Sequence, residues 1–262
     1  MVSFTDPTRE QAFAQWLARV GPAHGLLPDT VASASSDASF RRYLRIATQG
    51  GGSFVIMDAP PDKEDCRPFV HVAQLLAQGG LTAPRVIEAN LADGFLLLSD
   101  LGDTVYLAAL KAARQADMPR CDALYRDAIG ALLRLQALAD MHAPHGLPPY
   151  DRTRLVTEMA LFEQWYVTQH LQATLSDAER TGLQRCTELI VQSNLAQAQV
   201  LVHRDYHSRN LMVQASGNPG ILDFQDAVIG PITYDLVSLL RDAYIAWPEQ
   251  QQIDWAIRYW EL

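Results

Sequence analysis

The hydrophobic pattern of the chain changes near residue 100, and this change limits the folds that the chain can adopt. Before that residue, short apolar segments bounded by glycine, proline and polar residues are typical of strands. We expect these strands at 40–46, 53–58, 84–89 and 94–98, with helices at 9–20 and 66–78. After it, apolar residues three and four positions apart predict helices at 122–141, 153–171 and 177–196, and again from Tyr234 onward. Short strands at 200–202, 211–213 and 221–223 interrupt this helical part.

Two short polar segments mark where the strand-rich part turns and where it ends. Gln49-Gly50-Gly51-Gly52 predicts a hairpin turn between two of the strands. The segment 99–103, Ser-Asp-Leu-Gly-Asp, predicts a hinge. We therefore expect an α+β, two-lobed fold, with a small β-rich N-terminal lobe at 1–100 and a larger helical C-terminal lobe at 101–262.

Composition argues against several classes of function. The 262 residues carry a net charge of −9, whereas a nucleic-acid partner usually requires a basic face. No apolar stretch approaches the roughly 18 residues that cross a bilayer, and the polar N-terminus around Asp6 does not resemble a signal peptide. The three cysteines are far apart and form no CxxC motif, so we expect neither disulfides nor a zinc site. The expectation is a cytoplasmic protein with no nucleic-acid or membrane partner and no evident obligate protein partner.

One polar loop carries the residues that point to chemistry. It reads VHRDYHSRNLM at 202–212, so Asn210 follows Asp205 by five residues, and Asp223 in ILDF follows thirteen residues later. This spacing matches the kinase pattern H-R-D-x-x-x-x-N with a downstream D-F. In phosphoryl transfer from ATP, Asp205 would accept the proton of the attacking hydroxyl, and Asn210 and Asp223 would supply oxygen ligands to Mg²⁺. The alternative is that Asp205 and Asn210 only cap a turn, but the joint match with the flanking strands argues against it.

The loop resembles that of the aminoglycoside phosphotransferase-like kinases, a branch of the protein-kinase-like fold. Further matches extend the resemblance to the bacterial anomeric kinases of N-acetylmuramate and N-acetylglucosamine. They are SSDASFRRYLR (35–45), MDAPPDKEDCRPFVHVAQLL (57–76), LLLSDLGD (96–103) and ILDFQDAVIGPITYDLVSLLRDAY (221–244). The resemblance implies ATP and Mg²⁺ as cofactors and a small-molecule sugar as substrate. It also implies transfer of the γ-phosphate to the C1 hydroxyl in cell-wall sugar recycling.

The chain departs from the protein-kinase pattern at the lysine of the third strand. Met57 stands at that position, and the following helix has no glutamate in its middle. Losing both members of an ion pair is self-consistent, because a lone buried glutamate would be costly. Another cation is then needed at the nucleotide phosphates, and our first choice is Arg42. The other candidates are Arg41, Arg45 and Lys63, and for each arginine the alternative is an ordinary solvated strand residue.

The glycine-rich loop of protein kinases is also replaced, here by small polar residues. Ser35, Ser36 and Ser39 are expected to bind phosphate through their N–H and hydroxyl groups, the alternative being a solvated turn. The segment formed by Ser99, Asp100 and Leu101 is expected to meet adenine with its backbone, the alternative being a plain loop that ends at Gly102.

Four further residues are candidates for contact with the substrate: Arg204, His207, Arg209 and Asp226. For the loop histidine the alternative is local hydrogen bonding, and for Asp226 it is a surface role. Asp235 is interpreted as a structural residue: the resemblance implies that it holds the backbone of the catalytic loop, with a helix N-cap role as the alternative.

Two rival functions stay open at this point. A kinase for another small hydroxyl compound, an aminoglycoside or an amino alcohol, would want an acidic pocket for a polycation, whereas the loop carries Arg204 and Arg209. A nucleotide-binding pseudokinase scaffold is favoured by Met57 and opposed by Asp205, Asn210 and Asp223. The last helical stripe continues to Leu262 without a capping signal, so we expect that the chain is truncated or that further residues follow.

Overall fold

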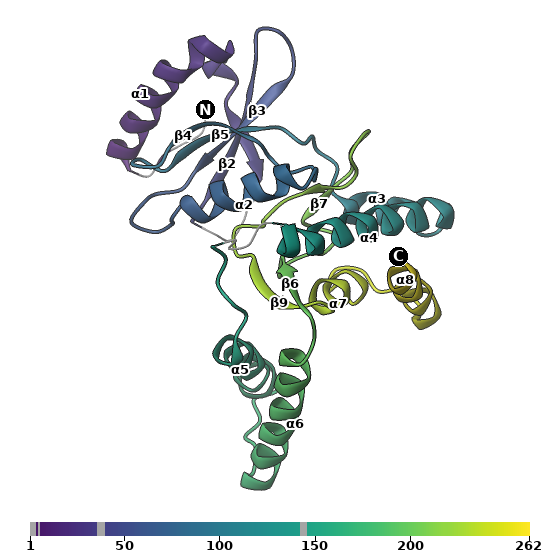
Figure 1. Cartoon of the computed structure of the whole chain (residues 1–262). Coiled ribbons are helices and arrows are strands. Elements are labelled where there is room, and N and C mark those ends of the chain that lie inside the picture. Colours follow the sequence, from purple (N-terminus) through teal and green to yellow (C-terminus); the bar gives the residue numbers. More distant parts are fainter. Residues whose placement is uncertain (1–3, 5, 36–39, 142–145) are drawn as a thin grey trace. The chain divides into compact units, whose positions relative to one another are not determined.

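The computed structural model describes residues 4, 6–35, 40–141 and 146–262 (Figure 1). Contacts divide the chain into two compact units, each built from two segments. Unit 1 comprises Met1–Asp127 and Arg209–Asp226, and unit 2 comprises Ala128–Ser208 and Ala227–Leu262. Unit 1 thus includes residues 101–127 and 209–226 in addition to the strand-rich part, and the predicted lobe boundary near residue 100 stays a prediction. The hinge at 99–103 itself stays a prediction.

Unit 1 is built on a five-stranded antiparallel sheet with the strand order β1-β2-β3-β5-β4. The strands are β1 (Ala32–Ser35), β2 (Arg42–Ala47), β3 (Ser53–Asp58), β4 (Val86–Asn90) and β5 (Phe95–Ser99). Four of them were predicted to within two residues at each end. The strand β1 was not, because its residues Ala-Ser-Ala-Ser lack the large apolar side chains that indicate a strand.

The turn between β2 and β3 confirms the hairpin that the glycines predict. The N–H of Thr48 donates to the carbonyl of Gly52 at 3.1 Å, and the N–H of Gly51 donates to the carbonyl of Thr48 at 3.1 Å. Gly51 and Gly52 have φ angles of 82° and 85°, in the left-handed region that glycine adopts without steric cost.

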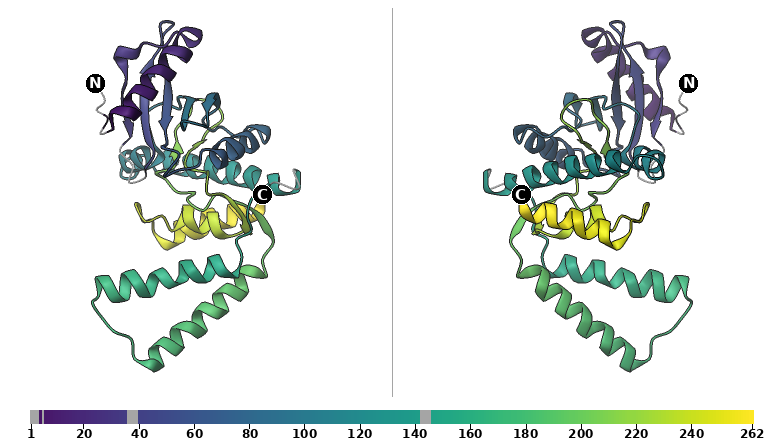
Figure 2. Two further views of the ribbon diagram at one scale, coloured as in Figure 1. Left: turned by 90° about the vertical axis from the view of Figure 1, so that its left-hand side faces the viewer. Right: turned by 90° about the vertical axis from the view of Figure 1, so that its right-hand side faces the viewer.

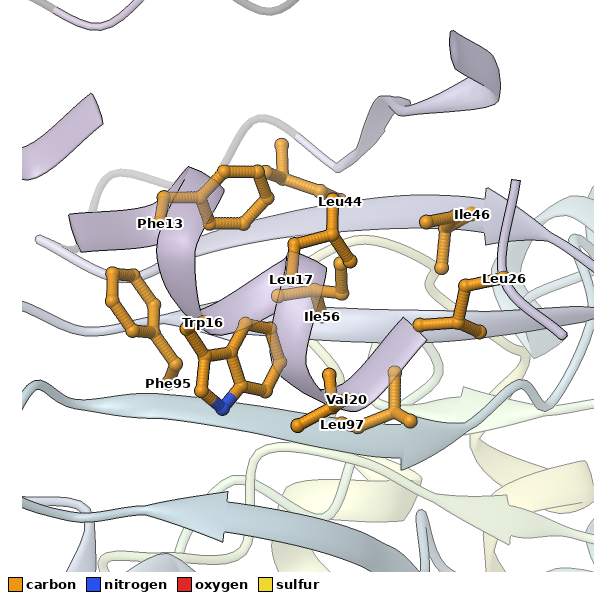
Figure 3. Packing of buried hydrophobic residues seen from close by; sticks show 10 residues of the cluster. All are labelled: Phe13, Trp16, Leu17, Val20, Leu26, Leu44, Ile46, Ile56, Phe95 and Leu97. Atoms are coloured by element: carbon orange, nitrogen blue, oxygen red, sulfur yellow. The ribbon is translucent and has the colours of Figure 1, made fainter. Parts of the chain in front are cut away.

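Helix α1 (Pro7–His24) covers one face of this sheet (Figure 3). The Asp6 side chain caps the helix by accepting a hydrogen bond from the N–H of Thr8 at 2.8 Å. The apolar stripe of α1 packs on buried side chains of three strands and of the loop after the helix. The cluster contains Phe13, Trp16, Leu17, Val20, Leu26, Leu44, Ile46, Ile56, Phe95 and Leu97.

The pairing of β2 with β3 decides which side chains share a face of the sheet. Leu44 is opposite Ile56, and Arg42 is opposite Asp58, so these residues lie on the face that α1 covers. Tyr43 is opposite Met57, so Met57 lies on the other face. This assignment matters for the arginines of β2, which alternate between the two faces.

The rest of unit 1 packs around the 209–226 segment. Its elements are the 3₁₀ helix η1 (Pro28–Thr30), α2 (Arg67–Gln78), α3 (Tyr106–Ala113), the first part of α4 up to Asp127, and the hairpin of β7 (Leu211–Met212) and β8 (Gly220–Ile221). The ring of Phe69 on α2 lies 4.8 Å from that of Phe224, which is fully buried. The N–H of Ile221 donates to the carbonyl of Thr82 at 2.7 Å. These contacts place the D-F segment beside α2.

Unit 2 is mostly helical, as predicted. It contains the C-terminal part of α4 (Met118–Met141), then α5 (Arg152–Leu161), the π-helix η2 (Phe162–His170), α6 (Asp177–Leu195), α7 (Tyr234–Leu240) and α8 (Glu249–Glu261). Strand β6 (Gln199–Val202) pairs with β9 (Val228–Pro231). Figure 2 shows α5 continuing into η2 and the chain returning along α6. The segment predicted as a single helix at 153–171 is therefore an α-helix followed by a π-helix. The spacing of its apolar residues does not reveal this change.

The three cysteines, Cys66, Cys121 and Cys186, are free thiols. Among the described residues, no helix is both long enough and apolar enough to span a membrane.

Candidate active site

The loop that carries Asp205 follows β6 in unit 2, and a buried carboxylate fixes its backbone. Asp235 on α7 is 1% exposed. It accepts hydrogen bonds from the backbone N–H of His203 at 2.7 Å and of Arg204 at 3.0 Å, one to each carboxylate oxygen. This confirms the structural role predicted for Asp235, and the N-cap position of α7 is occupied by Thr233 instead.

Further hydrogen bonds fix the loop on both sides of Asp205. The N–H of Asp205 donates to Nδ1 of the buried His203 at 3.2 Å, so the imidazole acts as an acceptor at this nitrogen. The Tyr206 hydroxyl donates to the carbonyl of Ala128 at 2.8 Å, and the N–H of Ser208 donates to Asp242 at 2.9 Å. Asp205 itself is exposed, whereas Tyr206 is fully buried. The loop thus presents the predicted base to solvent from a fixed backbone.

The two predicted metal ligands lie together in unit 1. The β7–β8 hairpin joins them, since the N–H of Leu222 donates to the carbonyl of Asn210 at 2.9 Å. The amide Nδ2 of Asn210 lies 3.4 Å from Oδ2 of Asp223. Asp223 has a φ of 60°, a left-handed conformation that is uncommon outside glycine but that aspartate tolerates. The sequence spacing therefore does bring this amide and this carboxylate to one place.

This pair fits a magnesium ion that also binds phosphate. Mg²⁺ in nucleotide sites is usually held by one or two protein oxygen ligands together with phosphates and waters. Asn210 and Asp223 supply an amide oxygen and a carboxylate, and Asp223 also accepts from Gln225 Nε2 at 2.8 Å. No group of three or more His, Cys, Asp and Glu side chains that could hold a metal occurs in the described part of the chain. A cage built from such side chains alone is therefore not what these residues form.

The predicted hinge residues are held inside unit 1. Asp100 accepts from Arg45 Nη2 at 3.0 Å, from Ser53 Oγ at 2.6 Å and from the N–H of Gly102 at 2.9 Å. Burial alone would raise the pKa of Asp100, but these hydrogen bonds outweigh burial and lower it. The Ser99 hydroxyl accepts from the N–H of Arg85 at 2.9 Å, and the carbonyl of Leu101 accepts from Gln214 at 2.6 Å. The contact of this segment with adenine stays a prediction.

The candidate cations of the sheet are all engaged with carboxylates. Arg42 donates Nε to Asp58 at 3.0 Å, and its guanidinium lies 4.1 Å from the ring of Phe4, on the α1 face and away from Met57. Arg41 pairs with Glu64 at 3.1 Å, Arg45 pairs with Asp100 and Asp103, and the exposed Lys63 lies 3.6 Å from Asp62. Our first choice, Arg42, thus lies on the face of the sheet opposite to Met57, and which of these cations replaces the missing lysine stays a prediction.

The remaining candidates are placed as follows. The backbone of Ser35 belongs to β1, while Ser36 and Ser39 lie outside the described residues. The ring of His207 contacts that of Tyr244 at 5.3 Å, and its Nδ1 is buried without a hydrogen-bond partner among the described residues. Arg209 and Asp226 are exposed, and Asp226 accepts from Gln225 at 3.2 Å. The roles of these residues stay predictions.

The structure adds residues that the sequence did not indicate. Arg204, a predicted substrate contact, donates Nη2 to Glu158 on α5 at 2.6 Å. Glu158 stands 46 residues earlier in the chain, and no motif or spacing connects the two. Asp242, which holds the N–H of Ser208, was also missed, although it lies within a segment that carries the family resemblance.

The chain has a β-rich unit, a helical unit and an H-R-D-x-x-x-x-N loop. Together these features define the class of protein-kinase-like phosphotransferases. Solved structures agree on the fold. The GDP complex of aminoglycoside 2'-phosphotransferase-IIIa matches with a TM-score of 0.66 and 17% identity, covering 96% of this chain and 83% of that one. A macrolide 2'-phosphotransferase from Brachybacterium faecium matches with a TM-score of 0.62 and 16% identity, covering 95% and 82%. The chain belongs to the phosphotransferase enzyme family, whose model matches residues 30–262.

Named relatives are more similar to this chain in sequence than these solved structures are. An N-acetylmuramate/N-acetylglucosamine kinase from Pseudomonas putida is 49% identical over 233 residues, which cover 88% of this chain and 65% of the relative. Relatives of the same name from Pseudomonas aeruginosa and Neisseria meningitidis are 46% and 41% identical and cover 89% and 97% of this chain. The aligned region spans 65%, 66% and 72% of the lengths of these three relatives, so the chain corresponds to roughly two thirds of them.

Proposed function

We propose that this protein transfers the γ-phosphate of ATP to the anomeric hydroxyl of N-acetylmuramate or N-acetylglucosamine. The observation that carries the proposal is the 41–49% identity to relatives named as kinases of these two sugars. The fixed loop around Asp205 and the pairing of Asn210 with Asp223 support it, because both features suit phosphoryl transfer.

In the proposed reaction, the C1 oxygen of the sugar forms a bond to the γ-phosphorus. The bond between that phosphorus and the β,γ-bridging oxygen breaks, and ADP leaves. Asp205 takes the proton of the C1 hydroxyl and later returns it to solvent. The anomeric hydroxyl is the most acidic one on a reducing sugar, so one carboxylate base at a fixed position suffices.

Asn210 and Asp223 are the residues that would hold Mg²⁺. When bound, the ion neutralises charge on the β- and γ-phosphate oxygens. The protein's own contribution there is an amide and a carboxylate that approach each other within 3.4 Å at the end of the β7–β8 hairpin. Solved neighbours with this fold are described as complexes with GDP and with ADP, so a test of the donor should include both ATP and GTP.

The three unpaired cysteines support a reducing compartment, and we propose that the enzyme works in the cytoplasm on sugars released from the cell wall. The acetamido group of the sugar should be read by hydrogen bonds, because a polar pocket rejects an analogue without its partner group more firmly than an apolar pocket does. Glucose should therefore be a poor substrate.

The test is a turnover assay with ATP and Mg²⁺ on a panel of sugars and aminoglycosides, with phosphorus NMR of the product. We expect N-acetylglucosamine and N-acetylmuramate to react and a product signal coupled to the anomeric proton. The methyl glycoside, blocked at C1, should not react. A signal coupled to the C6 protons would refute the anomeric position. Turnover of aminoglycosides alone would refute the sugar, and binding of ATP without any turnover would favour the pseudokinase.

A further inference from the structure

Glu158 on α5 accepts hydrogen bonds from three residues of unit 2, two of which are distant in sequence. Its Oε1 accepts from Arg204 Nη2 at 2.6 Å. Its Oε2 accepts from the hydroxyl of Tyr150, which precedes α5, and from that of Tyr234 at 3.3 Å, the first residue of α7. Both carboxylate oxygens are thus used, and one side chain joins the candidate catalytic loop to α5 and α7.

The surroundings of this cluster favour fixed contacts. Tyr150 is 2% exposed, and its ring packs edge-on against that of Tyr234 with the centroids 5.3 Å apart. The guanidinium carbon of Arg204 lies 5.9 Å from the Tyr150 ring. Burial raises the pKa of both tyrosine hydroxyls, so they remain protonated donors across the ordinary pH range. Arg204 and Glu158 are about one-quarter exposed, which leaves their pair only partly screened by solvent.

The backbone of Arg204 is strained at the residue directly before Asp205. Its φ angle is 79°, in the left-handed region where a residue with a side chain is uncommon. Such a conformation persists only when the surrounding structure determines it. Asp235 holds the N–H of Arg204, and Glu158 holds its guanidinium, so two separate helices fix this one residue.

We propose that Glu158 is a positioning residue for the base: by holding Arg204, it keeps the backbone before Asp205 in the conformation that directs Asp205. This inference rests on the proposed role of Asp205 in phosphoryl transfer. In this proposal the guanidinium of Arg204 binds Glu158 and so stabilises the catalytic loop. It does not contact the sugar. Glu158 itself touches no reacting atom in this proposal.

The test compares two carboxylates of the same pair of helices. Glu188 on α6 pairs with Arg152 of α5 at 2.6 Å, and both side chains of that pair are exposed. We expect Glu158→Gln to lower kcat about tenfold with little change in KM for ATP, since the nucleotide contacts are untouched. Glu188→Gln should leave kcat and KM unchanged. Melting curves of both variants show whether they are folded at the assay temperature.

A double-mutant cycle separates positioning from simple stabilisation. Glycine adopts a φ of 79° without steric cost, so Arg204→Gly removes both the strain and the partner of Glu158. Adding Glu158→Gln to Arg204→Gly should therefore lower kcat no further. An unchanged kcat in Glu158→Gln overturns the proposal. So does a loss of kcat that disappears on cooling together with a lowered melting temperature, because that pattern indicates a structural role only.

Hydrogen exchange of the loop tests the inference independently of activity. The amides of Asp205 and His207 are bonded to His203 Nδ1 and to the carbonyl of Asp205, so their exchange reports the loop conformation. Glu158→Gln should speed exchange in the 203–208 segment by several-fold, and Glu188→Gln should not. If no sugar is turned over but this difference appears, the proposed function fails and the positioning of the loop stands. Equal exchange in both variants overturns the positioning.

Discussion

Asp58 and Asp235 are both buried carboxylates, one in each unit, with exposures of 0% and 1%. Asp58 at the end of β3 is held by side chains: Arg9 of α1 donates to one oxygen at 2.6 Å, and Arg42 of β2 donates to the other at 3.0 Å. Asp235 is held by the backbone, through the N–H groups of two successive residues of the loop before Asp205. The first carboxylate ties a helix to a sheet, whereas the second fixes the path of a chain segment.

The difference shows what each buried charge is used for. Charged partners on flexible stems, as at Asp58, can adjust when one element moves. Two adjacent backbone donors, as at Asp235, leave the chain between them little freedom, and the exposed Asp205, which we propose as the base, follows directly after. We therefore expect damage at Asp58 to appear mainly in stability and damage around Asp235 to appear mainly in catalysis. Substitutions at and around the two carboxylates test that difference.

The largest effects should come from the proposed reacting groups of the two units. Asp205→Asn and Asp223→Asn should each lower kcat by roughly 10²–10⁴, the usual scale for a general base or a lost ligand at the phosphates. Only Asp223→Asn should also raise the Mg²⁺ concentration needed for half-maximal rate, because the role proposed for Asp205 is proton transfer and not metal binding. Steady-state kinetics over a magnesium titration measure both effects. Asp62→Asn, at an exposed residue of the β3–α2 loop, serves as the control. Near-normal turnover in Asp205→Asn would remove it as the base.

Asp58→Ala should lower the free energy of unfolding by about 3–5 kcal/mol, because it leaves Arg9 and Arg42 without their buried carboxylate. At a temperature where the variant is folded, kcat should stay close to that of the parent. Urea unfolding and kinetics on the same preparation measure the two quantities. Asp103→Ala, which removes an exposed partner of Arg45, should cost less than about 1 kcal/mol. A large loss of kcat in folded Asp58→Ala would contradict the expectation that damage at Asp58 appears mainly in stability.

The pH dependence of stability should carry the signature of Asp235. Burial raises the pKa of this carboxyl to about 7, against the opposing effect of its two backbone hydrogen bonds. The folded state therefore binds a proton more tightly than the unfolded chain, where aspartate titrates near 4. Between about pH 4 and pH 7 the free energy of unfolding should fall as pH rises, by at most about 1.4 kcal/mol per pH unit, and then level off.

Comparison with Asp235→Asn isolates this contribution, since asparagine does not titrate. The difference in unfolding free energy between parent and variant, measured by urea at several pH values, should change across that window and be constant above it. We expect kcat to change with pH in the opposite direction to the free energy of unfolding. A protonated Asp235 accepts poorly at one oxygen, so activity should decline as the pH falls below about 7 in the parent. A difference that does not vary with pH would show that Asp235 stays ionised throughout.

The sequence predicted the strand-rich first part and the mostly helical second part, and its motif spacing singled out the loop, because each rests on local patterns. A short run of apolar residues, Phe-Val-Ile-Met at 54–57, indicates β3, and the H-R-D-x-x-x-x-N spacing indicates Asp205 and Asn210. The contact of Glu158 with Arg204 could not be predicted, because it joins residues 46 positions apart through the packing of α5 on the loop. Alternation alone places Arg42 and Leu44 on one face of β2 and Tyr43 on the other, but the face of Met57 depends on the register with β3, which only the structure supplies.

The register of β2 with β3 also bears on the smallest effect that we expect from a substitution, which concerns the cation that replaces the missing lysine. Arg42 shares the α1 face with Asp58, whereas Met57 lies on the face of Tyr43, where alternation also places Arg41 and Arg45. Arg45 is held by Asp100, and Arg41 is held by Glu64 in the connection to α2. An arginine–glutamate pair beside α2 is the nearest counterpart to the lysine–glutamate pair of protein kinases. We therefore expect Arg41→Ala to raise KM for ATP about three- to tenfold and to lower kcat, because a cation at the phosphates stabilises the charge that develops there.

Arg42→Ala and Arg45→Ala provide the comparison for Arg41→Ala. Arg42→Ala should lower the melting temperature with little change in KM for ATP, because its partner is the structural Asp58. Arg45→Ala should have an intermediate effect, because it releases Asp100 in the predicted hinge. Glu64→Gln separates two possibilities for Arg41: if the glutamate only orients the guanidinium, KM for ATP should rise less than in Arg41→Ala. If all three alanine variants keep the parental KM and kcat, none of these arginines replaces the lysine. If Arg42→Ala is the only variant that raises KM for ATP, then Arg42 is the cation at the phosphates, although it lies on the face of β2 opposite to Met57.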